Sequence, residues 1–171
     1  KTEDDATVIE EKTVLTQDSV VTLAAAEDII ADGVSALYPQ GVTKDNPKGE
    51  AYGKLNVRIE DTNTGADEKL ENVSLDVNGY LNLMDNIDAA ESINLNSALG
   101  LDVSKSLTAT NITGTSEGDI NLMGGNITGT NVRFEVGNSS DFNLKAGTIE
   151  GANVNIKAGD DTNLHGRIIV S

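Results

Sequence analysis

Hydrophobic and polar residues alternate along much of the carboxyl-terminal part of the chain. Ile120 and Leu122 enclose one polar residue, and Val132, Phe134 and Val136 continue the alternation after a short gap. A period of two residues is typical of a β-strand with one buried face. Glycines at 124–125, 137, 147 and 159 separate these runs, and we expect them to provide corners with positive φ. The pattern predicts short strands joined by glycine corners.

A repeat of about 20 residues underlies this alternation. Residues 119–140 (DINLMGGNITGTNVRFEVGNSS) align without a gap on residues 141–162 (DFNLKAGTIEGANVNIKAGDDT), an offset of 22. The next unit starts 20 residues further on, and Val103 and Leu83 extend the column of Leu122 backwards at spacings of 19 and 20. A sustained period of this length predicts a β-solenoid whose turns pair as parallel strands about 4.8 Å apart.

Other repeat architectures fit this pattern less well. A leucine-rich repeat requires its own leucine spacing and a different convex segment, a β-propeller requires a longer period, and helical repeats require apolar spacings of three and four. The sequence therefore predicts an all-β parallel β-helix with rungs of about 20 residues. The repeats occupy residues 72–171, and residues 1–71 are expected to form an irregular amino-terminal portion.

The amino-terminal portion is predicted to contain irregular rungs or a cap. Residues 13–15 and 19–23 resemble strands, whereas residues 24–31 fit either a short helix or a rung in which Leu23 and Ile29 face inward. The rung is favoured because the apolar end of a solenoid has to be covered. Residues 38–53 and 61–69 read as projecting loops around an alternating strand at 54–60. Tyr38 and Tyr52 flank the first loop and form a candidate binding surface.

Charge and composition exclude several partners. The chain has 12 basic and 28 acidic residues, a net charge of −16, which repels nucleic acid and anionic membrane surfaces. No apolar run approaches the roughly 20 residues of a membrane span, so membrane insertion is not expected. The 171 residues contain no cysteine and do not begin with Met, and we expect a processed product or a fragment of something longer.

Catalytic chemistry has little to build on. His165 is the single histidine and is expected at an exposed corner, so a catalytic triad or a histidine metal site would rest on one residue. Asp119, Asp141 and Asp161 recur at one corner and are expected to be solvated. We expect no enzyme activity and no cofactor, with Ca²⁺ at this aspartate corner as the alternative.

Polar residues recur in register as well. Four asparagines share a position between two inward-facing residues, with Asp102 interrupting the set. Stacked rungs would place their amides above one another as a hydrogen-bonded ladder, a structural role. Glu135 and Lys157 are expected to form an exposed ion pair between rungs. The predicted ladder comprises Asn82, Asn121, Asn143 and Asn163.

The repeat itself resembles a known family. Residues 145–166 (KAGTIEGANVNIKAGDDTNLHG) and 118–134 (GDINLMGGNITGTNVRF) resemble the haemagglutinin repeats of filamentous-haemagglutinin-type exoproteins. The resemblance covers residues 72–171 and implies a right-handed parallel β-helix in a secreted or cell-surface adhesin of a Gram-negative bacterium. The family exports such stalks through an outer-membrane partner. This chain departs from the family in lacking the amino-terminal secretion domain and in being much shorter.

Three functional hypotheses follow. The first is a non-enzymatic, extracellular structural or adhesive β-helix that contacts a receptor on a host or neighbouring cell. The second is a self-assembling subunit of an extracellular filament, whose partners are copies of itself, because residues 166–171 form an apolar strand without a polar cap. The third is a polysaccharide-active β-helix enzyme, since such folds include lyases with clustered aspartates.

Overall fold

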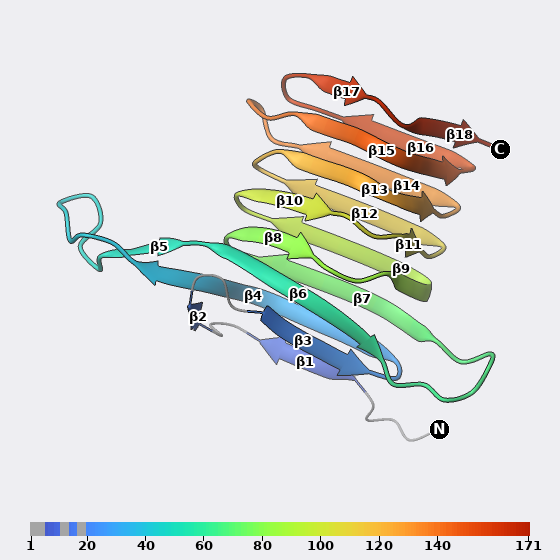
Figure 1. Cartoon of the computed structure of the whole chain (residues 1–171), viewed down its shortest axis with the longest axis horizontal. Coiled ribbons are helices and arrows are strands. Elements are labelled where there is room, and N and C mark those ends of the chain that lie inside the picture. Colours follow the sequence, from blue (N-terminus) through green and yellow to red (C-terminus); the bar gives the residue numbers. More distant parts are fainter. Residues whose placement is uncertain (1–5, 11–13, 17–19) are drawn as a thin grey trace.

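The regular elements of the protein are β-strands that wind into a parallel β-helix (Figure 1). The computed structural model describes residues 6–10, 14–16 and 20–171, with side chains for all of these except residues 9, 10, 14–16, 38 and 39. Successive turns stack from the amino-terminal to the carboxyl-terminal end, and each turn contributes strands to two faces that enclose the core. The predicted all-β solenoid is therefore confirmed.

Face 1 consists of parallel strands that pair from one turn to the next. The strand β9 bends, so that its first residues belong to face 2 and its later residues to face 1. In order along the solenoid, face 1 contains β1 (Thr7–Glu10), β4 (Asp28–Pro39), β7 (Leu70–Val77), β9 (Ile87–Ser97), β12 (Asn111–Ser116), β14 (Asn131–Val136) and β16 (Asn153–Lys157).

Face 2 is parallel throughout as well. Two short strands, β11 (Leu107–Thr108) and β18 (Arg167–Val170), extend it towards the corner. Two further strands, β2 (Val14–Thr16) and β5 (Glu50–Tyr52), pair with the end of β4. The main strands of face 2 are β3 (Val20–Ala25), β6 (Lys54–Asp61), β8 (Tyr80–Leu83), β10 (Gly100–Val103), β13 (Ile120–Thr128), β15 (Phe142–Gly151) and β17 (Thr162–Leu164).

The strand registers give the length of each rung directly. On face 2, Leu81 pairs with Leu101, Leu101 with Ile120, Ile120 with Phe142, and Phe142 with Thr162, which are spacings of 20, 19, 22 and 20 residues. These values confirm the period predicted from the sequence. The parallel pairing also continues across residue 71, because β4 pairs with β7 and β6 with β8.

The core is a set of vertical columns of apolar side chains. Phe134 and Phe142, both fully buried, pack with their ring centroids 5.4 Å apart. Gly114 lies directly below Phe134 in the register, and a Cβ atom at Gly114 would approach the Phe134 ring to 2.6 Å. The column thus accommodates a large ring on one rung because the rung beneath it has no side chain.

The corner glycines have two different physical roles. Gly147 adopts a φ of 87°, as predicted, because a residue with a Cβ atom is disfavoured there. The prediction of positive φ is wrong for Gly137 and Gly159, which do not have it. A Cβ atom at Gly159 would lie 2.0 Å from the carbonyl oxygen of Gly137, so this glycine is required by the close approach of two rungs.

The amino-terminal portion joins the same solenoid. Residues 24–31 form the end of β3 and the start of β4, so the rung prediction is correct and the helix alternative is wrong. Leu23 and Ile29 are buried, as expected for inward-facing residues. Residues 13 and 19 of the predicted strands lie outside the described residues. The loops after β4 and after β6 project from opposite sides of the solenoid (Figure 1).

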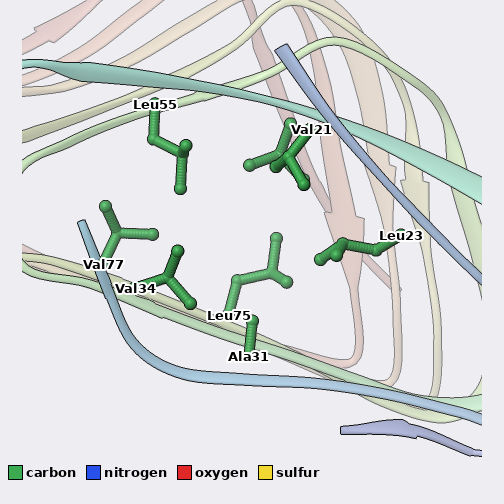
Figure 2. A pocket seen from close by; sticks show the side chains of 8 residues that line it. Val21, Leu23, Ala31, Val34, Leu55, Leu75 and Val77 are labelled. Carbon is green, nitrogen blue, oxygen red and sulfur yellow. The ribbon is translucent and has the colours of Figure 1, made fainter. Parts of the chain in front are cut away.

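The interior beneath the first wide turns contains a small apolar cavity (Figure 2). Its lining has no polar side chain, and the gap persists because residues such as Ala31 and Val34 are short. A cavity of this chemistry is expected to be dry. The lining residues are Val21, Leu23, Ala31, Val34, Leu55, Val57, Leu75 and Val77.

Candidate functional site

The predicted asparagine column forms a hydrogen-bonded ladder on the outside of face 2. The side-chain amide of Asn163 donates to Asn143 Oδ1 at 2.9 Å, and that of Asn143 donates to Asn121 Oδ1 at 3.1 Å. Asn121 in turn donates to a carboxylate oxygen of Asp102 at 3.0 Å. These bonds tie four successive rungs together through their side chains.

The ladder is interrupted below Asp102. Asn82 donates to Asn56 Oδ1 at 2.8 Å, which adds a residue that the sequence prediction did not include. A carboxylate only accepts hydrogen bonds, so Asp102 has no proton to donate to Asn82, the next residue down the column. The ladder therefore consists of a lower pair and an upper series that ends on Asp102.

Asp102 lies within a cluster of unlike groups. Its carboxylate is 3.4 Å from Lys54 Nζ and 3.4 Å from the Tyr80 hydroxyl group. The Tyr80 ring lies over Gly100, where a Cβ atom would approach it to 2.3 Å, and Lys54 Nζ is 5.0 Å from the ring centroid. Burial, followed by the negative charge of Asp102, raises the pKa of the Tyr80 phenol. Lys54 and Gly100 both contact the ring, so little of it is left to stack on a ligand.

A second ladder follows the outside of face 1, and it was not predicted. Asn153 donates to Asn131 at 2.9 Å and Asn131 donates to Asn111 at 2.8 Å. Further down the same column, Asn72 donates to the carboxylate of Asp28 at 3.0 Å. The spacing of 20 and 22 residues between the three upper asparagines was available from the sequence. The spacing of 44 between Asn72 and Asp28 was hidden by the two insertions.

A third column, also on face 1, combines amides, a hydroxyl group and charges. Asn96 donates to Asp76 at 2.7 Å and Thr115 donates to Asn96 at 2.7 Å. The expected ion pair above them forms, with Lys157 Nζ 2.8 Å from the Glu135 carboxylate. Hydrogen bonds from Lys157 and then from Arg133 lower the pKa of Glu135.

All three columns share one polarity. In each of these hydrogen bonds, the residue on the later rung donates to the residue on the earlier rung. Each series ends at its amino-terminal side on a carboxylate, namely Asp102, Asp28 or Asp76. An acceptor-only group fits that end because nothing further down requires a proton from it.

The recurring aspartate corner has a structural role. The backbone N–H of Asp141 donates to Asp119 Oδ1 at 2.8 Å, and that of Asp161 donates to Asp141 Oδ1 at 3.0 Å. Each carboxylate thus satisfies a backbone donor of the rung above it. Among the residues that the structure describes, no group of three or more histidine, aspartate and glutamate side chains is arranged to hold a metal ion. His165 lies exposed near the same corner.

The first projecting loop is an ordered hairpin. Its strands are antiparallel, with Leu37 opposite Tyr52, and the loop between them is organised by Asn46. The Asn46 side-chain amide donates to the Glu50 carbonyl group at 2.7 Å, and its backbone N–H donates to Thr43 Oγ1 at 3.0 Å. The structure places Tyr38 opposite Ala51, but the side chain of Tyr38 lies outside the described part of the chain.

Two apolar side chains of this hairpin face solvent. Val42 is 75% exposed and Tyr52 is 50% exposed. Exposed apolar groups on a projecting, hydrogen-bonded loop are available for contact with another surface. Sequence reasoning found Tyr52 from its position beside the loop but missed Val42, whose exposure depends on the hairpin geometry.

The fold and these columns define the class of protein: a parallel β-solenoid whose rungs are linked by side-chain ladders. No family model, curated protein or solved structure matches the chain. In the described residues, no helix has the length and apolar character required to cross a membrane.

Proposed function

We propose that this protein is a non-enzymatic, extracellular structural and adhesive β-helix that presents the hairpin after β4 to a receptor on a host or neighbouring cell. The resemblance of its repeat to filamentous-haemagglutinin-type exoproteins supports a secreted bacterial adhesin. The observation that carries the proposal is a division of labour. Outward polar side chains of the regular rungs bond to other rungs, whereas Val42 and Tyr52 of the hairpin remain exposed.

An adhesion assay tests this proposal. Beads coated with the 171-residue chain are incubated with epithelial cells and with bacterial cells, and bound beads are counted. We expect binding to one cell type, and we expect a Val42→Ser, Tyr52→Ser double variant to lose most of it. Leu99→Ser is the matched control, since Leu99 is 48% exposed but lies on the solenoid itself. Absence of binding to every cell type, or equal loss with the control, would contradict the proposal.

Assembly into filaments is the second candidate function. It is favoured by the last turn, where Leu164 is 49% exposed and Val170 is 65% exposed, although the corresponding column below Leu164 is buried. Electron microscopy of the purified chain distinguishes the two candidates, since regular filaments are expected only for a self-assembling subunit. A polysaccharide-active enzyme is the third, and release of reducing ends from acidic polysaccharides would favour it over both.

A further inference from the structure

The strands of the last turn leave one edge of the solenoid open. Among the described strands, β16 pairs only with β14, and β17 and β18 pair only with β15. Leu164 and Ile168 are 49% and 38% exposed, whereas Leu144 and Ile149, their partners one rung below, are fully buried. The open edge therefore presents the same kind of apolar column that other rungs cover.

The ladders give this edge a defined hydrogen-bonding polarity. Asn163 and Asn153 use their amide nitrogens to donate to the rung below, at 2.9 Å in both cases. The amide group is planar, with its oxygen on the side away from the nitrogen, so both oxygens face the open side. Lys157 adds a positive charge to the same edge. The edge thus requires side-chain donors at two columns and favours a carboxylate at a third.

The amino-terminal turn of a second copy does not supply those donors. In the column of Asn163, the lowest described residue is Val20, which pairs with Asn56 and has no side-chain proton to donate. Two copies joined through the same edge would be no better, because acceptors would face acceptors. Contact between copies would bury apolar surface but leave the ladders incomplete.

A rung with the chemistry of residues 131–151 fits all three columns. In the repeat register, its Asn131 lies above Asn153 and its Asn143 above Asn163, so both positions donate towards the edge. Its Glu135 position lies above Lys157 and provides the complementary charge. The apolar positions match too: Phe134 lies above Ile156, Leu144 above Leu164 and Ile149 above Ile168.

We propose that the edge formed by β16, β17 and β18 binds a parallel β-rung of a separate polypeptide, and that this rung must carry asparagine at both ladder positions. The proposal narrows the partner in the assembly function, on which it rests, and is independent of the hairpin. The partner is thus another asparagine-bearing solenoid, and ladder polarity sets the direction in which it stacks.

Peptide binding to the intact chain tests this. A fluorescent peptide with the sequence of residues 131–151 (NVRFEVGNSSDFNLKAGTIEG) is titrated with the 171-residue chain, beside a peptide in which both ladder asparagines are aspartate. The aspartate peptide turns two donors into acceptors, and we expect it to bind at least about tenfold more weakly. We expect Leu164→Lys in the chain to abolish binding of the asparagine peptide, and Leu99→Lys, at a similarly exposed site away from the edge, to leave it unchanged.

The outcomes separate this inference from the assembly function. Equal binding of both peptides, or binding of neither to a chain whose circular dichroism is unchanged, would overturn it. Filaments of the chain alone, seen by electron microscopy and prevented by Leu164→Lys, would show that a second copy occupies the edge, which overturns the inference but supports self-assembly. A monomeric chain that binds only the asparagine peptide supports the inference and contradicts self-assembly by copies.

Discussion

Asn121 Nδ2 lies 3.0 Å from a carboxylate oxygen of Asp102, one rung below it, and this contact ends the upper ladder of face 2. The same carboxylate also contacts Lys54 and Tyr80. One buried acidic group thereby joins the regular rungs to the wider turns at the amino-terminal side of the solenoid.

Replacing Asp102 distinguishes its roles as acceptor and as charge. Asp102→Asn keeps an acceptor for Asn121 and gains a donor for Asn82, so we expect the free energy of unfolding to change by less than about 1 kcal/mol. Asp102→Leu leaves the Asn121 amide, Lys54 and Tyr80 without this partner and is expected to cost about 2 kcal/mol. Urea unfolding measures both. Equal losses for the two variants would show that the ladder contact is energetically unimportant.

Close rung contact makes some glycines irreplaceable. A Cβ atom at Gly125 would lie 2.0 Å from the Lys105 carbonyl oxygen, which is backbone and cannot move aside cheaply. We expect Gly125→Ala to lower the free energy of unfolding by about 2 kcal/mol. Gly41→Ala is the control, since an added Cβ there meets nothing within 4 Å, and thermal unfolding should be unaffected. Equal melting temperatures for the two variants would contradict the steric explanation.

Filling the apolar cavity is expected to stabilise the protein. Ala31 lines this cavity, and Ala31→Val adds methyl groups to the empty space and raises β-propensity, a gain of about 1 kcal/mol. Ala25 has the same 4% exposure but does not line the cavity. Ala25→Val is therefore expected to be neutral or destabilising in the same thermal scan. A lower melting temperature for Ala31→Val than for Ala25→Val would indicate that the lining is rigid.

The ion pair between rungs predicts a specific titration. Because the pKa of Glu135 is lowered in the folded state, its contribution to stability is present above the ordinary pKa of a glutamate and is lost as the pH falls through the folded-state pKa. Lys157→Gln should move this pKa back towards the ordinary value, and by more than Arg133→Gln does. Carboxyl NMR titration measures both shifts. A larger shift with Arg133→Gln would contradict the assigned order of causes.

Much of the architecture was predictable because a solenoid repeats one local solution. Alternation of Val132, Phe134 and Val136 identified the strand, and the 22-residue offset gave its vertical partners. The ladder of Asn121, Asn143 and Asn163 followed from the same offset. Prediction was less successful where insertions shift the register, as for Lys54, which contacts Asp102 two rungs away. It was also less successful at Gly159, whose role depends on the approach of another rung.

The sequence alone determined the strand period, the rung length and the vertical columns, because in a parallel solenoid residues one period apart must lie above one another. The tertiary structure decided the polarity of the ladders, the carboxylates on which they end and the exposure of Val42. These features depend on which way an amide is turned and on how an insertion leaves and rejoins the stack. Neither is encoded in the spacing of residue types, since both directions of an amide ladder satisfy the same repeat.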